Sequence, residues 1–194
     1  MRKSWIVLTG QVLPVVAGFV LSGGLVWQAS HSAFTATTSN TGNSVGAATL
    51  NLTNDSTGPL FAITNAVPGT TGSRCIQISS TSPVASAVKL YTAAGTAPAN
   101  NISAYVGIRI ERGSGGTYDS CTNFTPAAEV FDNTLANLIT RTNYDNGIGP
   151  WALSGTTTTE TMSFRVTWTF ATNAPDTTQG GSTPTVTLTW EAQS

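Results

Sequence analysis

The stretch AFTATTSNTGNSVGAATLNL, residues 33–52, stands between an apolar N-terminal segment and a body of short alternating segments. It starts with an aromatic residue and Thr, continues through Thr, Ser, Asn and Gly, and ends with Leu50 and Leu52 on either side of a polar residue. Alternation of apolar and polar residues is typical of a strand with one buried face. The stretch therefore predicts an extended, uncharged arm that leads into a first strand.

The composition describes a folded chain with few charges. Only 9% of the 194 residues are Asp, Glu, Lys or Arg, against about 25% in a typical soluble domain, while 40% are hydrophobic. This apolar content is enough to form a core, which argues against general disorder. Without Arg2 and Lys3, six basic residues face nine acidic ones, a net charge of −3. Binding to nucleic acid or to anionic lipid is therefore not expected.

Residues 1–33 have the pattern of a secretory signal peptide, in which a positive start precedes an apolar run. Small residues follow this run, as signal peptidase requires: Ala29, Ser30, Ser32 and Ala33. Cleavage is expected near residues 29–33. The alternative is an uncleaved membrane anchor, since about 20 apolar residues can span a bilayer, although Pro14 disfavours it. Both interpretations predict export, and the first predicts contact with the membrane only through the leader, before processing.

Cys75 and Cys121 are the only cysteines in the chain. In an exported protein an even number of cysteines predicts a disulfide. The alternative is two unpaired buried thiols. A zinc site is not expected, because two thiols cannot supply the four ligands of a structural site.

Period-two alternation recurs along the rest of the chain. The alternating segments are 45–53, 61–63, 74–79, 84–92, 105–111, 162–170 and 186–192. Within 124–141 the apolar spacing changes to three and four, which predicts one or two short helical turns, best placed at 135–139. Residues 142–159 are expected to form a loop. Residues 34–194 thus predict a single all-β domain, an antiparallel β-sandwich of the jelly-roll type.

The chain shows no arrangement of residues that indicates an enzyme. Its one histidine, His31, lies in the leader, so neither a histidine zinc site nor a Ser-His-Asp triad can form. Acids such as Asp55 are scattered over turns, which favours solvated carboxylates over the alternative of a paired catalytic set. Asp145 begins an Asp-Asn-Gly sequence that predicts a tight turn rather than a calcium loop. No metal or cofactor is expected.

One loop of the predicted body carries two aromatic residues, Tyr144 and Trp151. Aromatic rings on an exposed loop can stack against sugar rings, so the pair is a candidate ligand platform. The alternative is that both rings fold onto the sandwich and contribute to its core.

Several stretches resemble the TasA/camelysin family, secreted proteins with a SipW-type signal peptide. The first are Ala33-Phe34-Thr35, Asn40 to Asn43 and Ala48-Thr49-Leu50-Asn51-Leu52. Further resemblance lies in the Pro-Gly turn at 67–70, in Phe131-Asp132-Asn133-Thr134-Leu135, and in 162–170 with 186–192, which resemble the family's closing hairpin. Ala48 and Asn133 stand where the family has Gly. The protease activity attached to the camelysin name has no visible catalytic residues in this sequence.

The resemblance implies a secreted structural subunit that assembles into extracellular or biofilm-matrix filaments. Its partners would be copies of itself, a signal peptidase of the SipW type and accessory matrix proteins. The arm, about residues 34–45 and including Phe34, Thr35 and Val45, would add as a strand to the sheet edge of the next copy. The alternative function is a monomeric cell-surface adhesin or carbohydrate-binding sandwich that uses Tyr144 and Trp151.

Overall fold

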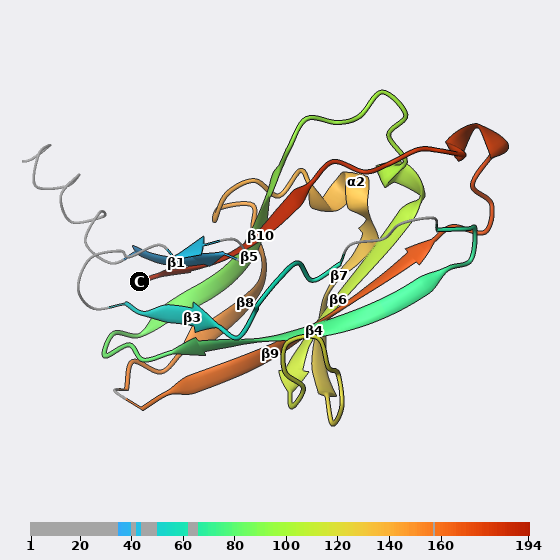
Figure 1. The fold of residues 1–194 in the computed structure, drawn as a ribbon. Coiled ribbons are helices and arrows are strands. Elements are labelled where there is room, and N and C mark those ends of the chain that lie inside the picture. The colour runs from blue at the N-terminus through green and yellow to red at the C-terminus, as the bar shows by residue number, and fades with distance from the viewer. Residues whose placement is uncertain (1–34, 40–41, 44–49, 62–65, 157) are drawn as a thin grey trace, which may run out of the picture. The chain divides into compact units, whose positions relative to one another are not determined.

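Two stacked antiparallel sheets make up the body of the computed structural model, which describes residues 35–39, 42–43, 50–61, 66–156 and 158–194. The strands are β1 (Thr35–Ser39), β2 (Gly42–Asn43), β3 (Leu52–Asn54), β4 (Thr71–Ser80), β5 (Ser86–Ala94), β6 (Val106–Ser114), β7 (Thr125–Thr134), β8 (Ile148–Leu153), β9 (Glu160–Phe170) and β10 (Val186–Gln193). One sheet has the order β2-β1-β10-β5-β8 and the other β3-β4-β9-β6-β7 (Figure 1).

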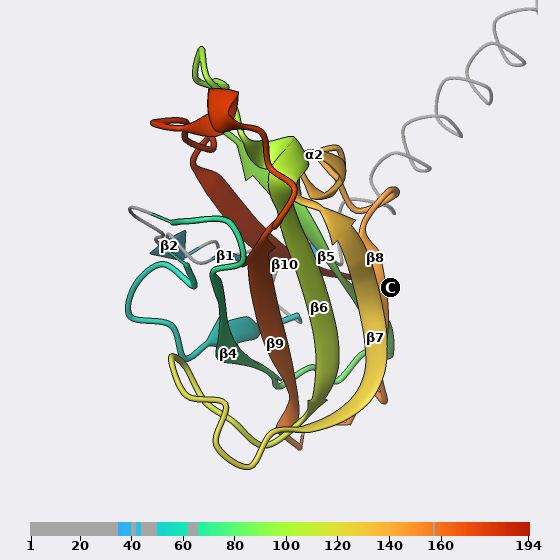
Figure 2. The same cartoon turned by 90° about the vertical axis from the view of Figure 1, so that its right-hand side faces the viewer.

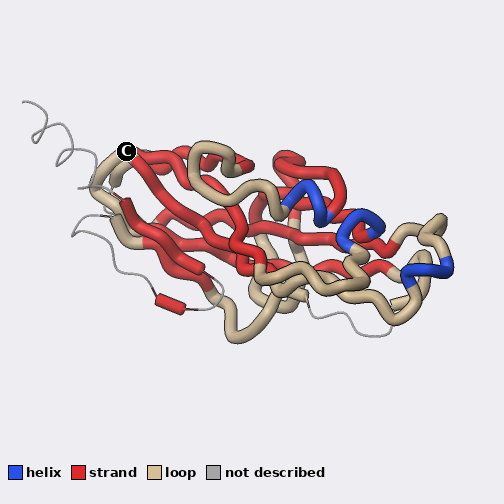
Figure 3. The backbone as a smooth tube through the Cα atoms, turned by 90° about the horizontal axis from the view of Figure 1, so that it is seen from above, coloured by secondary structure: helices blue, strands red, loops and turns tan. Residues whose placement is uncertain are grey.

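The strand order is that of a jelly roll. Successive strands from β4 onward pass from one sheet to the other, except at the β6–β7 hairpin, so β1-β10-β5-β8 faces β4-β9-β6-β7. Figure 2 shows β4, β9, β6 and β7 side by side as one of the two layers. Figure 3 shows how little of the described chain is helical. The predicted all-β sandwich of the jelly-roll type is confirmed.

The core lies between the sheets and is built from the alternating residues of both. Its largest fully buried side chains include Trp190 of β10 and Phe164 of β9, whose ring centroids lie 5.5 Å apart. The expectation that these two strands close the fold as a hairpin was wrong, because they belong to opposite sheets. Each strand is strongly alternating, and the two apolar faces meet across the core rather than side by side.

Strand β7 occupies much of residues 124–141, where the sequence predicted one or two short helical turns and no strand. Its pairing with β6 shifts register twice, between Ile110 and Glu111 and again between Arg112 and Gly113. Each shift adds a residue to β7 and reverses the faces that follow, so period-two alternation is lost in the sequence. A helical turn does follow at α2 (Leu135–Leu138), close to the predicted 135–139, and Leu135 and Leu138 are buried.

Strand β8 lies within residues 142–159, which were expected to form a loop. Its alternation consists of Gly149, Trp151 and Leu153 facing inward, with Pro150 and Ala152 exposed between them. Gly and Pro are rare in strand interiors, and Pro is tolerated mainly at a sheet edge, which is where β8 lies. The composition thus concealed an edge strand.

Several predicted features fall wholly or partly outside the described residues. The leader, the cleavage region at 29–33 and the arm residues Phe34 and Val45 lie there, as does the start of the strand expected at 45–53. In the strand expected at 61–63, Phe61 belongs to no strand and the remaining two residues lie outside the described part. Of the helices within the described ranges, none is long and apolar enough to cross a membrane.

Candidate assembly edge

The candidate site is the pairing of β1 with β10, beside the end of the first sheet that β2 forms. The two strands are antiparallel over five positions, from Thr35 opposite Gln193 to Ser39 opposite Thr189. Of the predicted arm, β1 is therefore described as a strand paired within its own chain. This is the arrangement of a closed, single molecule, and any exchange between copies starts from it.

Strand β10 lies between β5 and β1, and β1 is its strand neighbour on the side away from β5. Trp190 is 0% exposed and Ala192 is 0% exposed, so the face that β10 turns inward is central to the core. On the other side β10 pairs along its whole length with β5. Removing β1 would leave the backbone groups between Thr189 and Gln193 that face away from β5 without a strand partner. Such an edge is a template for an added strand.

The opposite side of the sandwich, where β7 and β8 end the two sheets, is poorly suited to further strands. Pro126 lies in β7 and Pro150 in β8, and a proline cannot donate to a new ladder. The two strands also touch each other, since a Cβ on Gly149 would lie 2.9 Å from the Cβ of Val130. The Arg112 guanidinium donates a hydrogen bond to the Pro150 carbonyl. Prolines and the β7 bulges are the usual protections against edge pairing.

The segment between β6 and β7 crosses the outer face of the second sheet and is attached there by the predicted disulfide. Cys75 and Cys121 are bonded, with Cα atoms 5.1 Å apart, and Cys75 is 0% exposed. We call residues 115–124 the strap. Gly116 of the strap lies against Cys75, where an added Cβ would be 3.3 Å from the sulfur, and its φ is +72°. The Asp119 N–H donates to the Cys75 carbonyl at 3.2 Å.

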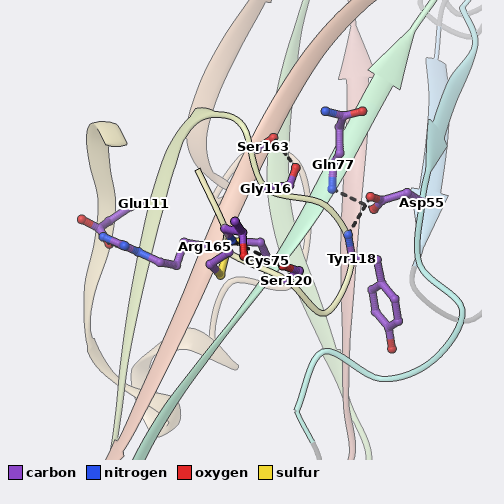
Figure 4. The surroundings of a disulfide bond; sticks show 11 residues. Asp55, Cys75, Gln77, Glu111, Gly116, Tyr118, Ser120, Ser163 and Arg165 are labelled. Atoms are coloured by element: carbon purple, nitrogen blue, oxygen red, sulfur yellow. Dashed lines mark hydrogen bonds and ion pairs between the residues drawn. A yellow bond between two sulfur atoms is a disulfide. The ribbon is translucent and has the colours of Figure 1, made fainter. Parts of the chain in front are cut away.

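A second attachment of the strap comes from Asp55, which the sequence indicated to be a solvated turn carboxylate. Its Oδ1 accepts from the Gln77 N–H at 2.8 Å and its Oδ2 from the Tyr118 N–H at 2.7 Å (Figure 4). The Tyr118 hydroxyl donates to the Pro59 carbonyl at 3.1 Å. The carboxylate therefore ties the strap to β4 and to the turn that follows β3. Asp55 and Tyr118 are 63 positions apart, and no pattern in the sequence predicted their contact.

A network of charges lies beside the strap on the outer face of the second sheet, and the sequence did not predict it. Glu111 is only 6% exposed and accepts from Arg165, with Nε at 2.8 Å and Nη2 at 2.6 Å. Arg109 lies 3.4 Å from Glu111 and 3.0 Å from Glu129. The Arg165 guanidinium also lies over the Phe124 ring, 4.8 Å from its centroid. These ion pairs connect β6 with β7 and with β9, and the Arg165–Phe124 contact connects β9 with the strap.

The suggested ligand platform does not form, because its two aromatic residues do not share an exposed surface. Trp151 is 6% exposed in β8 and belongs to the core. Tyr144 donates its hydroxyl to the Ala87 carbonyl at 2.8 Å, and the Lys89 ammonium lies over its ring, 4.6 Å from the centroid. Both rings thus agree with the alternative interpretation, in which they pack onto the sandwich.

Around Glu191, on the outer face of β10, two phenols have raised pKa values. Burial raises the pKa of Tyr91 to about 12, helped by a hydrogen bond with Glu191 and by the charge of that carboxylate. The pKa of Tyr144 is also raised, by burial and by the same charge. Glu191 is 8% exposed and accepts from the Gln193 amide at 2.7 Å. In register, Glu191 stands opposite Thr37 of β1 and Lys89 of β5.

Within the described part of the chain, no group of three or more His, Cys, Asp or Glu is placed to hold a metal ion. The Asp-Asn-Gly sequence beginning at Asp145 forms the predicted tight turn, in which the Gly147 N–H donates to the Tyr144 carbonyl at 3.1 Å. A comparison with protein-family models finds none that matches this chain, and a comparison with curated proteins finds no match either. The resemblance to the TasA/camelysin family therefore stands on the residues quoted for it.

Proposed function

We propose that this chain is a secreted structural subunit that joins copies of itself into extracellular or biofilm-matrix filaments by exchanging β1 between neighbours. The observation that carries the proposal is the pairing of β1 with β10. The inward-facing side chains of β10 are part of the core. A strand at this position can be replaced by the same strand from another copy without a change of register. Exchange of an identical element is a low-cost route to association.

The composition of the arm supports this role. Residues 34–45 contain no charge and no proline, so every position can take part in a backbone ladder. The prolines of β7 and β8 disfavour strand addition at one side of the sandwich. At the other side the sheets end at β2 and β3, and the proposal places the joint at the β1–β10 pairing there. Because each copy would donate at one place and accept at another, the contact is head-to-tail and generates an open filament unless the rotation closes a ring.

Processing fits the same scheme. The arm directly follows the predicted signal peptide, so cleavage by a signal peptidase of the SipW type would release it. An uncut leader would hold the arm at the membrane and keep the chain in its closed form. Accessory matrix proteins are further expected partners.

Electron microscopy and static light scattering test the proposal. A chain beginning at Phe34 should form filaments at high concentration, and a chain that lacks residues 34–43 should not. Adding a peptide of residues 34–45 to the shortened chain should give a one-to-one complex that does not grow. Equal filament formation by both chains, or a stable monomer of the longer chain, would overturn the proposal.

The register supplies a matched pair of peptides for the same assay. Thr37 stands opposite Glu191, so Thr37→Asp places like charges across the pair and Thr37→Lys places opposite ones. Such pairs change stability by about 0.2–1 kcal/mol each, so the Lys peptide should bind the shortened chain several-fold more tightly than the Asp peptide. Equal affinities would show that β10 is not the acceptor in this register.

The alternative of a monomeric adhesin or carbohydrate-binding sandwich makes the opposite prediction in light scattering. It also loses the surface first assigned to it, because Trp151 is part of the core. Trp151→Ala should therefore lower stability, whereas loss of glycan binding by a variant of unchanged stability would support the alternative.

A further inference from the structure

The edge of β10 is only partly covered in the single chain. β10 has eight residues and pairs with β5 at all of them, from Val186 opposite Ala94 to Gln193 opposite Ala87. β1 covers five of these positions, and its last pair is Ser39 with Thr189. Residues 186–188 thus have a strand partner on the β5 side and none, among the described strands, on the β1 side. We call residues 186–188 the open edge.

β2, the next described strand after β1, does not lie along the open edge. β2 pairs back onto β1, with Thr38 opposite Asn43 and Ser39 opposite Gly42. After β2 the same chain has to reach β3, which packs close to β1 and β10 and which Figure 1 shows next to β1, near the C-terminus. β2 therefore lies on the side of β1 that faces away from β10, and the open edge is left without a partner among the described strands on that side.

The register states which residues would fit the open edge. Each step forward along β1 is one step backward along β10. Continuing this register places Asn40 opposite Leu188, Thr41 opposite Thr187, and Gly42 opposite Val186. None of the three arm residues is charged or a proline, so each can take its place in the ladder.

We infer that the open edge is a docking surface for residues 40–42 of a second copy, whose arm straightens when it is donated. This inference rests on the proposed exchange of β1 and adds a change of shape to it. A donated arm leaves the sheet of its own chain, so β2 of that arm can pair with the acceptor's β10 in place of β1. Straightening gives up the two β1–β2 pairs and gains three pairs with β10, so the donated strand is longer than the closed one.

Paired cysteines distinguish the two arrangements. Directly opposed Cα atoms in an antiparallel ladder lie about 4.5–5.5 Å apart, within the range of a disulfide. The test pair is Thr41→Cys with Thr187→Cys, placed in the full-length chain and analysed after export under mild oxidation. The control pair is Thr35→Cys with Gln193→Cys, which is already opposed within one chain and has the same parity along the strands.

The control pair should give links within one chain in monomers and links between chains in filaments. The test pair should give no link in monomers and links between chains in filaments, in a yield similar to the control. Filaments that link through the control pair and not through the test pair would overturn the straightened arm and leave the exchange of β1 intact. The absence of any link between chains for both pairs would overturn the exchange, and the inference with it.

Hydrogen exchange of the unsubstituted protein gives a readout that needs no variant. Backbone amides at 186–188 that face away from β5 should exchange more slowly in filaments than in monomers. Amides of the β10–β5 ladder should be protected in both states. Equal exchange of the open edge in both states would contradict its occupation by a second copy.

Discussion

Removal of the Cys75–Cys121 disulfide should have a large and calculable effect on stability. The two residues are 46 positions apart in the chain. A crosslink that closes a loop of this length lowers the entropy of the unfolded chain, which corresponds to about 4 kcal/mol at room temperature. Cys75→Ala combined with Cys121→Ala avoids leaving a buried free thiol. The double variant should therefore lose about 4 kcal/mol in its free energy of unfolding.

The folded state of the double variant should keep its strap, because the attachments at Asp55 do not depend on sulfur. The carboxylate still accepts from the backbone of Gln77 and Tyr118, and Tyr118 still reaches the Pro59 carbonyl. The loss should thus come from the unfolded chain and should appear without a change in the tryptophan fluorescence spectrum of the folded protein. A second variant, Asp55→Asn, keeps the crosslink and weakens these hydrogen bonds, at an expected cost of about 1–3 kcal/mol.

Guanidinium unfolding followed by tryptophan fluorescence measures the difference. Because each kcal/mol shifts the melting temperature of a domain of this size by about 2–4 °C, the double variant should melt roughly 8–16 °C lower. Thr122→Ala, an exposed change in the same strap, is the control and should stay within about 0.5 kcal/mol of the parent. A loss below about 1 kcal/mol for the double variant would refute the reasoning from the unfolded chain.

The core and the outer face of β10 give three further tests. Trp190→Ala should cost about 3–5 kcal/mol in urea unfolding, and Trp190→Phe, which keeps a ring against Phe164, should cost less; equal costs would contradict the ring contact. Gly72→Ala should cost about 1–3 kcal/mol in thermal unfolding, because its Cβ would lie 2.7 Å from the Trp168 ring; an unchanged melting temperature would contradict this. The Tyr91 pKa is raised from 10.0 to about 12, so its contribution to stability is complete below pH 10.0 and is lost as the pH rises toward 12. Tyr91→Phe should make this decline shallower in a pH series, and an identical decline would count against the assignment.

The features that the sequence predicted correctly are those with a local signal. Strands such as β9 and β10 alternate over nearly their full length, so their buried faces can be identified residue by residue. Two cysteines allow only one pairing within a molecule, and the structure has it. The α2 turn was also predictable, since leucines spaced by three at Leu135 and Leu138 suit a helical turn.

The features that were missed depend on neighbours in space. The bulges of β7 are defined by its pairing with β6, and without them the spacing of its apolar residues mimics a helix. β8 contains Gly149 and Pro150, which weaken a strand interior, and its edge position makes the proline acceptable. Asp55 accepts hydrogen bonds from Gln77 and Tyr118, and the buried Glu111 accepts one from Arg165. Because these partners are far apart in the sequence, no local pattern indicated either contact.

A sandwich has two sides at which its sheets end, and this chain treats them differently. At β7 and β8, prolines, bulges and the Arg112 contact with Pro150 disfavour strand addition. At β10, the edge is covered by β1, an uncharged strand that lies ahead of the rest of the body in the sequence. Growth through β7 and β8 would require a ladder across prolines, whereas growth through β10 repeats a pairing that the closed chain already makes. Filaments linked through the proline side would therefore contradict the interpretation of both edges, and linkage through β10 alone is the outcome that their difference predicts.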